Sequence, residues 1–479
     1  MKSFSLFIFI LLYSAVSFAQ WQTEVRLTFA PGDSYEPLNS SRGIALNGNT
    51  VHVVWADERD GNREIYYKRS TDKGLTWGPD NRFTNNPASS WRPSVSVNGT
   101  TVHLVWCDEI SGNFEIYYKR STDDGINWSE NTRLTFDSAR SWAPSLAVTG
   151  SVLHIVWPES RDLNEEVYYK RSTDNGLSWG PDTRLTYDSS GTYYPSVAVS
   201  GSNVHVVWYD FRTGRRTVFY KRSTNGGTNW GADTQLTSGS SESYNATVCV
   251  SGFAVHVAWQ DTRFGAEEIF YMRSSDGGLT WSSENRMTSN SGISWYPSIS
   301  VAQNNVHLAW QDNTTGNYEI YYDRSTNDGI TWDQIPQLTN DTAESLRPSI
   351  AVLDSSVHVV WNDKRDGNFE VYYKRNPTGN PVGINNISGV IPSAYSLSQN
   401  YPNPFNPVTN VKFSILSSGL VKIVVYDILG REVQTLVNER LQPGTYETSF
   451  DGSQLTSGVY FYKMITDEYS ETRKMLLIK

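Results

Sequence analysis

The chain has 479 residues, enough for one large domain and a smaller one, and its formal net charge is −10. Aromatic residues make up 13% of it, with 17 tryptophans and 28 tyrosines. An acidic chain lacks the clustered lysine and arginine that hold phosphate backbones, so the composition argues against nucleic-acid binding.

The first 19 residues have the pattern of an export signal. Lys2 supplies the positive start, residues 6–16 form an apolar run too short to span a bilayer, and Ser17 and Ala19 are the small residues that a signal peptidase needs. We predict cleavage before Gln20 and an exported, soluble mature protein without a transmembrane segment.

Every histidine occupies the same position of an internal repeat. Each lies in a V/L-H-x-x-W pentad, and the spacing between successive histidines is 51 residues. The seven are His52, His103, His154, His205, His256, His307 and His358. A residue type confined to one repeat position belongs to the architecture, so no histidine remains as a unique acid, base or metal ligand.

Each repeat predicts four short strands, because β-branched and aromatic runs alternate with Gly, Asn and Asp turns. In the second repeat these strands are expected at residues 93–97, 102–106, 115–120 and 132–135. Four strands in about fifty residues, repeated in tandem, are typical of a β-propeller blade, and a solenoid of the same period is the alternative.

The two ends of the repeat array complement each other. There are seven histidine strands but six complete S-x-[DN]-x-G-x-x-W turns, since the repeat after Arg375 breaks off. Residues 21–28, W-Q-T-E-V-R-L-T, match residues 128–135, W-S-E-N-T-R-L-T. We therefore predict a seven-bladed ring closed by an N-terminal strand, which leaves no open sheet edge, with six blades as the alternative.

The six turns suit tight hairpins, in which an Asp or Asn side chain accepts backbone hydrogen bonds, a glycine supplies positive φ and a tryptophan pins the turn. The acceptor positions are Asp72, Asp123, Asp174, Asn225, Asp276 and Asn327. This pattern resembles the Asp-box, or bacterial neuraminidase repeat, of sialidase-like propellers. The resemblance implies a structural role, because in that family these turns lie on the face opposite the active site.

The catalytic residues of sialidases cannot be carried over to this chain. Arg92-Pro93-Ser94 and Arg347-Pro348-Ser349 lack the apolar residue of the sialidase R-I-P motif. Acid-x-Arg pairs such as Asp57 and Arg59 recur through the repeats, which favours structural ion pairs over a unique acid and base. We therefore identify no catalytic residue and lean against an enzyme.

No metal-ligand spacing and no cofactor motif occurs in the sequence, so we expect neither a metal nor a cofactor. The two cysteines, Cys107 and Cys249, occupy different repeat positions. That difference favours two buried free thiols over a disulfide.

Aromatic and polar residues at the start of the first strand of each repeat are the candidate ligand site. We expect them to ring the mouth of a central channel, where exposed flat rings suit stacking on sugars. Packing between blades is the alternative role. The candidates are Trp91, Arg92, Trp142, Tyr193, Tyr194, Tyr244, Trp295, Tyr296 and Arg347.

The fourth repeat differs most from the others. Arg215 and Arg216 replace the usual Asn-Phe-Glu type of sequence, and Tyr209 lies beside Asp210. This basic spot on an acidic protein could receive an anionic group or be incidental.

Residues 397–479 lack the repeat and predict a small antiparallel immunoglobulin-like sandwich. Their sequence resembles the type A C-terminal sorting domain of the type IX secretion system. The matching motifs are N-Y-P-N-P-F-N-P at 400–407, V-Y-D-I-L-G at 425–430, L-T-S-G-V-Y-F-Y-K at 455–463 and K-M-L-L at 474–477. The resemblance implies export through the outer-membrane translocon, followed by surface attachment or release.

The predicted organisation is a signal peptide at 1–19, a propeller at 20–376, a linker at 377–396 and the sorting domain at 397–479. The near-perfect repeat favours a monomeric binding propeller that contacts a glycan or a protein partner on the face opposite the Asp-boxes. The alternative is a sialidase-like glycoside hydrolase with an unrecognised site. The one length change inside the ring is five extra residues between Trp21 and Trp77.

Overall fold

The structure, a computed structural model, describes residues 21–35, 42–162, 164–333, 337–377, 385–388, 392–417, 419–441, 443–452, 455–466 and 468–479. Regular structure within these residues is all β. The chain divides into two compact units, Thr23–Gly379 and a second unit made up mainly of Asn380–Lys479. The predicted signal peptide lies outside the described residues.

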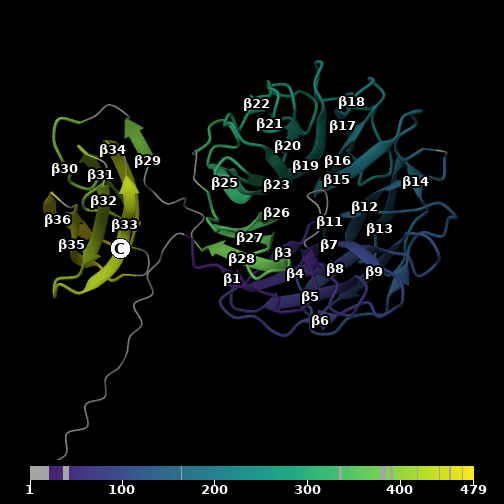
Figure 1. The fold of residues 1–479 in the computed structure, drawn as a ribbon, viewed down its shortest axis with the longest axis horizontal. Helices are drawn as coiled ribbons and strands as arrows, with labels where there is room; N and C mark the ends of the chain where they lie inside the picture. The colour runs from purple at the N-terminus through teal and green to yellow at the C-terminus, as the bar shows by residue number, and fades with distance from the viewer. Residues whose placement is uncertain are drawn as a thin grey trace, which may run out of the picture. The chain divides into compact units, whose positions relative to one another are not determined.

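The described part of the first unit forms seven antiparallel sheets, one for each histidine, which are arranged in a ring (Figure 1). The first four sheets consist of β2 (Ser34–Tyr35), β3 (Ile44–Asn47), β4 (Thr50–Asp57), β5 (Glu64–Ser70) and β6 (Asn81–Arg82); β7 (Ser90–Asn98), β8 (Thr101–Asp108), β9 (Glu115–Ser121) and β10 (Thr132–Arg133); β11 (Ser145–Thr149), β12 (Val152–Glu159), β13 (Glu166–Ser172) and β14 (Thr183–Arg184); and β15 (Thr192–Ser200), β16 (Asn203–Asp210), β17 (Thr217–Ser223) and β18 (Thr234–Gln235).

The remaining three sheets consist of β19 (Ser243–Ser251), β20 (Ala254–Asp261), β21 (Glu268–Ser274) and β22 (Asn285–Arg286); β23 (Ser294–Ala302), β24 (Asn305–Asp312) and β25 (Glu319–Ser325); and β26 (Ser345–Leu353), β27 (Ser356–Asp363), β28 (Glu370–Asn376) and β1 (Val25–Arg26). The innermost strands, which we call the inner strands, are β3, β7, β11, β15, β19, β23 and β26 (Figure 1). In the last sheet β1 pairs with β28, with Val25 opposite Tyr373.

Each histidine holds a tyrosine of its own sheet, and six of these tyrosines contact a tryptophan of the neighbouring sheet. His52 Nδ1 shares a hydrogen bond of 2.8 Å with the Tyr67 hydroxyl, and all seven histidines make the same pair at 2.6 to 2.8 Å. The ring of Trp128, from the next sheet, packs edge-on against Tyr67 with centroids 5.0 Å apart. The equivalent contact between Trp77 and Tyr373 joins the first sheet to the last.

Burial keeps these histidines neutral. It lowers the pKa of His103, His154, His205 and His256 to about 4, and that of His307 and His358 to about 3. Each imidazole is therefore uncharged at neutral pH and serves the packing between sheets.

The acid-x-Arg pairs brace the opposite end of the same strands. Asp57, fully buried, accepts hydrogen bonds from Trp55 Nε1 and Ser34 Oγ, both at 2.8 Å, and pairs with Arg59 Nη2 at 2.7 Å. Arg59 also reaches Asp80 at 2.7 Å. Although burial alone would raise it, hydrogen bonds from Arg59 and Trp55 lower the pKa of Asp57. These pairs are structural ion pairs, because both partners are already satisfied within the sheet.

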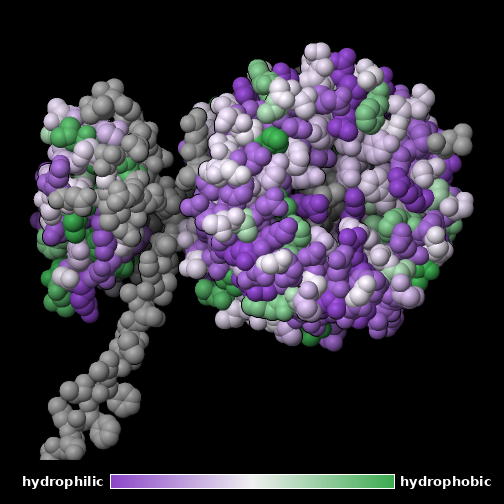
Figure 2. Space-filling model, in the orientation of Figure 1, coloured by the Kyte–Doolittle hydropathy of each residue, from purple (hydrophilic) through white to green (hydrophobic). Residues whose placement is uncertain are grey.

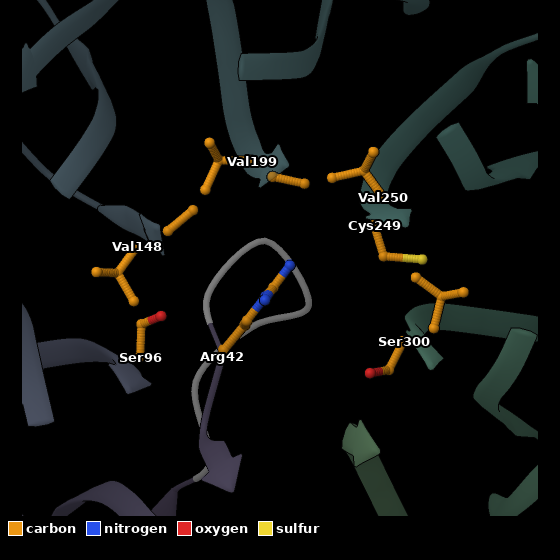
Figure 3. A pocket seen from close by; sticks show the side chains of 10 residues that line it. Arg42, Ser96, Val148, Val199, Cys249, Val250 and Ser300 are labelled. Carbon is orange, nitrogen blue, oxygen red and sulfur yellow. The ribbon is translucent and has the colours of Figure 1, made fainter. Parts of the chain in front are cut away.

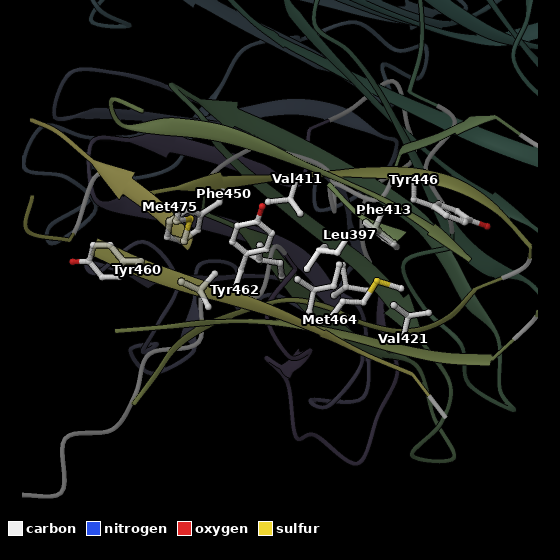
Figure 4. Packing of buried hydrophobic residues seen from close by; sticks show 14 of the residues in the cluster. Leu397, Val411, Phe413, Val421, Tyr446, Phe450, Tyr460, Tyr462, Met464 and Met475 are labelled. Atoms are coloured by element: carbon white, nitrogen blue, oxygen red, sulfur yellow. The ribbon is translucent and has the colours of Figure 1, made fainter. Parts of the chain in front are cut away.

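The second unit has two four-stranded antiparallel sheets around one core. The strands are β29 (Asn385–Ser388), β34 (Gly444–Asp451), β31 (Val408–Ile415) and β30 (Ser396–Leu397) in one sheet, and β33 (Glu432–Leu441), β32 (Gly419–Tyr426), β35 (Gly458–Ile465) and β36 (Ser470–Leu477) in the other. Alternate residues of both sheets are buried between them, with Val411 and Phe413 facing Val421, Tyr462 and Met464 (Figure 4).

Candidate functional site

Five of the seven inner strands begin earlier than the sequence indicates. The sequence predicts a start at Pro93, whereas β7 begins at Ser90 and carries a β-bulge between Trp91 and Ser94. The same bulge occurs in β15, β19, β23 and β26. Two residues of the inner strand therefore stand opposite one residue of the second strand, which re-aims the side chains at this end.

The residue after the bulge aromatic has a left-handed backbone. The φ values lie between 45° and 54° at Arg92, Ala143, Tyr194, Asn245, Tyr296 and Arg347. This conformation costs a residue with a side chain about 1–2 kcal/mol, and strained positions of this kind gather at binding and active sites. Part of the cost is offset, since the backbone N–H of Tyr296 and that of Arg347 donate to Gln260 and Gln311 of the preceding sheets.

A repeated backbone here carries side chains that are not repeated. The histidine, tryptophan and glycine positions hold one residue type throughout, but the left-handed position holds Arg, Ala, Tyr, Asn, Tyr and Arg. We call this position and the residue before it the rim. Its members are Trp91, Arg92, Trp142, Ala143, Tyr193, Tyr194, Tyr244, Asn245, Trp295, Tyr296, Leu346 and Arg347.

The faces of the rim rings are largely covered, in contrast to the exposed rings expected from the sequence. The Arg63 guanidinium carbon lies 3.3 Å from the centroid of a Trp91 ring. Arg92 lies over Trp142 and Tyr194 at 4.7 and 5.2 Å. A ligand at the rim would therefore meet guanidinium groups and ring edges, which suits charged or hydrogen-bonding groups better than flat stacking.

Two rim arginines have no acidic partner among the described residues. Arg92 Nη2 donates a hydrogen bond of 3.4 Å to the Tyr194 hydroxyl, and Arg347 lies 6.0 Å from the Tyr296 ring centroid. Other arginines near the rim are paired, for example Arg63 with Glu58 at 2.6 Å. Arg92 and Arg347 flank the first sheet on either side, because they belong to β7 and β26.

The five extra residues of the sequence fall at the rim of the first sheet. Tyr35 pairs with Ala56 as Trp91 pairs with Cys107, and Ile44 pairs with Val53 as Val95 pairs with Leu104. The interval between these two pairs is five residues longer in the first sheet. Residues 36–41 of this insertion lie outside the described residues, and Arg42 follows them.

Arg42 points into the central channel (Figure 3). Its backbone N–H donates to Ser94 Oγ at 3.2 Å, the next N–H donates to Ser349 Oγ at 3.1 Å, and its Nη2 donates to the carbonyl of Val248 at 3.4 Å. The cavity around it measures about 110 Å³. The other lining residues are uncharged: Ser96, Ala147, Val148, Ala198, Val199, Cys249, Val250, Ser300 and Val301.

Burial lowers the pKa of the Arg42 guanidinium, because the charge sits in a channel with little water around it. Sequence reasoning missed this residue. The five extra residues indicated an irregularity in the first repeat. The strand register then shows that Arg42 occupies the position in the channel wall that Pro93 occupies in the second repeat.

The basic spot of the fourth repeat is partly neutralised. Arg216 Nε lies 3.7 Å from Glu242, and the Arg216 guanidinium lies 4.8 Å from the Tyr244 ring. Arg215 Nη1 donates to the carbonyl of Gly239 at 2.9 Å. Tyr209 is buried among the rings of Tyr193, Tyr194, Phe211 and Tyr244.

The S-x-[DN]-x-G-x-x-W turns lie at the other end of the sheets from the rim, because they join the third strand to the fourth. Asp72 accepts hydrogen bonds from Thr76 N at 2.8 Å and Thr76 Oγ1 at 2.6 Å. Asp123, Asp174, Asn225, Asp276 and Asn327 accept the equivalent backbone bond. With their oxygens engaged inside the turn, these side chains stabilise the hairpin.

The described residues bring no three His, Cys, Asp or Glu side chains together as ligands of a metal ion would require. None of the described segments forms a helix with the length and apolarity needed to cross a membrane. Cys107 and Cys249 are free and buried, as the repeat positions predict. The face of the first unit in view is mostly hydrophilic, with scattered apolar residues (Figure 2).

Residues 399–479 match the protein family described as "Secretion system C-terminal sorting domain". The second unit is a secretion-system sorting domain. The chain is therefore exported by type IX secretion to the cell surface or the extracellular space. No protein with curated annotation matches the chain in sequence.

Three solved structures are similar in fold. The polysaccharide lyase Uly1 superposes with a TM-score of 0.54 at 8% identity, over 75% of this chain and 100% of that chain. Trypanosoma rangeli sialidase gives 0.43 at 12% identity over 83% and 86%, with 2,3-difluorosialic acid bound. Phage phi92 endosialidase gives 0.47 at 11% identity over 96% and 87%. At such identities the likeness concerns the β-propeller fold alone.

Proposed function

We propose that the chain is an exported, seven-bladed β-propeller that binds acidic glycans through the rim. In this proposal β1 closes the ring, the S-x-[DN]-x-G-x-x-W turns are Asp-boxes, and the sorting domain is an immunoglobulin-like sandwich. A signal peptide at 1–19 precedes the propeller and a linker at 377–396 follows it. Closure is supported by the apolar cluster that joins Leu27 and Trp55 to Val360 and Tyr373.

The observation that carries the ligand class is the set of arginines on three consecutive inner strands. Arg347 on β26, Arg42 beside β3 and Arg92 on β7 have no carboxylate within ion-pair distance in the described part of the chain. On a protein of net charge −10, the two guanidinium groups at the rim, together with that of Arg42 inside the channel, form a local positive site. Carboxylate and sulfate groups of a polysaccharide match their donor geometry.

The strength of such a site can be bounded. A hydrogen bond to a charged group contributes about 1.5–3 kcal/mol, so two rim arginines could account for about 3–6 kcal/mol of binding. That energy corresponds to a factor of at least about 100 in affinity. Part of the attraction is screened by salt, because the rim residues are half-buried rather than enclosed.

The proposal is tested on the exported protein with a panel of uronate-rich, sulfated, sialylated and neutral glycans. We expect binding to the acidic members that weakens as salt rises, and no binding to the neutral ones. Binding to neutral glycans alone would contradict the proposal. Release of sugar during the same incubation would instead favour the glycoside-cleaving alternative, and capture of no glycan would favour a protein partner.

A further inference from the structure

Several of the sequence motifs of the sorting domain lie in loops at the same end of the sandwich. β31 begins at Val408 and ends at Ile415, and β32 begins soon after it in the chain, at Gly419, and ends at Tyr426. Val408 pairs with Asp451, Tyr426 with Glu432 and Phe461, and Gly458 with Leu477. Loops 400–407 and 427–431, residues 455–457 and the C-terminal residues therefore meet at one end, which we call the motif end.

The core confirms this arrangement. Phe450, Tyr460 and Met475 lie at one end of the packed side chains, and Val421 and Tyr446 lie at the other (Figure 4). The first group belongs to strand segments that adjoin the motif end.

Part of the loop at 400–407 packs against the core and is hydrogen-bonded to β36. Phe405 is 2% exposed and packs against Phe450, with ring centroids 5.7 Å apart. Its backbone N–H donates to Leu476 at 2.9 Å, and Asn403 Oδ1 accepts the Leu476 N–H at 2.9 Å. These bonds fasten the loop across both sheets and close the core.

In the first part of the loop the backbone is hydrogen-bonded to β31, but the side chains face outward. Residues 401–404 are all exposed, and the Tyr401 side chain is 82% exposed. The turn after β32 likewise combines a residue that fixes the backbone with exposed apolar side chains. Asp427 Oδ1 accepts hydrogen bonds from Leu429 N at 2.9 Å and Arg431 N at 3.0 Å, which fixes the turn, while Ile428 and Leu429 are 70% and 72% exposed.

Exposed apolar side chains on a firmly held scaffold need a reason, because they cost solubility and add nothing to the core. The two exposed groups lie at the same end of one sandwich. Tyr401 pairs with Asn410 near the start of β31, and Ile428 and Leu429 follow directly after the end of β32. Both exposed groups therefore belong to the motif end, where one partner protein can contact them together.

We propose that the motif end, with Tyr401, Ile428 and Leu429 as its apolar anchors, is the surface that the secretion machinery recognises. A sorting domain has to fold and has to be recognised by the export machinery. Because these three side chains are exposed and add nothing to the core, we assign them to recognition. The occupant is therefore an apolar, aromatic-accepting pocket of an export component, which would bury the three side chains as interface anchors.

The test uses the full chain in cells that carry the secretion system. The double variant Ile428→Ser/Leu429→Ser should lower the exported fraction at least about tenfold, the loss expected when two anchors leave an interface. Full-length protein should accumulate in the periplasm. Tyr401→Ser alone should give a smaller loss in the same direction.

The matched control is Leu416→Ser, which removes another exposed leucine, 39% exposed, at the opposite end of the sandwich. It should export normally. Urea unfolding of each purified full chain separates recognition from folding, and the sorting domain should keep its midpoint in every variant. Equal export of the double variant and the control would overturn the proposal, and so would an export loss that appears only with a lowered midpoint.

Discussion

Acidification from pH 7.5 to 5.5 should strongly destabilise the propeller through its seven histidines. The folded protein holds them neutral, with pKa values of about 3 to 4 for six of them, while an unfolded chain takes up protons below a pKa of about 6.5. The stability is therefore fully present above pH 6.5 and is lost as the pH falls towards 4.

The magnitude follows from linkage. A histidine whose pKa drops from 6.5 to about 4 on folding loses slightly more than about 1 kcal/mol of stability between pH 7.5 and 5.5, and the six with such values together lose about 8 kcal/mol. Domains are typically stable by about 5–15 kcal/mol, so the loss is comparable to the whole. The turn carboxylates act in a lower window, because hydrogen bonds hold their pKa values near 2 at Asp123 and Asp174.

Urea unfolding followed by tryptophan fluorescence measures this directly. Sixteen of the 17 tryptophans belong to the first unit and none lies beyond Trp361, so the signal reports mainly the propeller. His103→Gln should reduce the pH dependence by about one proton of seven. An unfolding free energy at pH 5.5 within about 1 kcal/mol of that at pH 7.5 would refute the reasoning, since it would mean that the folded histidines protonate freely.

Two further predictions concern the turns, and both are read from the urea midpoint. Gly125→Ala should cost more than about 3 kcal/mol, because its new methyl group would lie 2.0 Å from the Tyr67 hydroxyl; Gly112→Ala, also at positive φ but with open space, should cost only about 1–2 kcal/mol. Asp72→Asn should be nearly neutral, since Asn327 bonds to the same three groups of its own turn, whereas Asp72→Ala should lose about 1 kcal/mol. Equal costs within either pair would contradict the account.

The repeat made much of the fold predictable from sequence. The fixed spacing located the strands that hold His103 and Trp106, and the match of residues 21–28 to a fourth strand anticipated the pairing of β1 with β28. Such features can be predicted from the local sequence pattern, because the same pattern occurs in every repeat.

The rim was harder to predict because its geometry is not local. A residue before proline normally has an extended backbone, so the left-handed φ of Arg92 and the earlier start of β7 were not foreseen. The covering of Trp91 by Arg63 depends on a contact across two sheets. Glu242, the neighbour of Arg216, lies in the connection to the next sheet, so the sequence showed a basic spot where the structure has a pair.

The central claim is that rim arginines without a carboxylate partner bind the ligand, and paired dissociation constants test it most directly. An acidic glycan that binds the exported protein should bind Arg347→Ala at least about tenfold more weakly, as the loss of one charged hydrogen bond predicts. Arg216→Ala, which removes an arginine beside the rim residue Tyr244 and 3.7 Å from Glu242, should leave the constant within about twofold. Unchanged affinity in Arg347→Ala, or a loss confined to Arg216→Ala, would contradict the account.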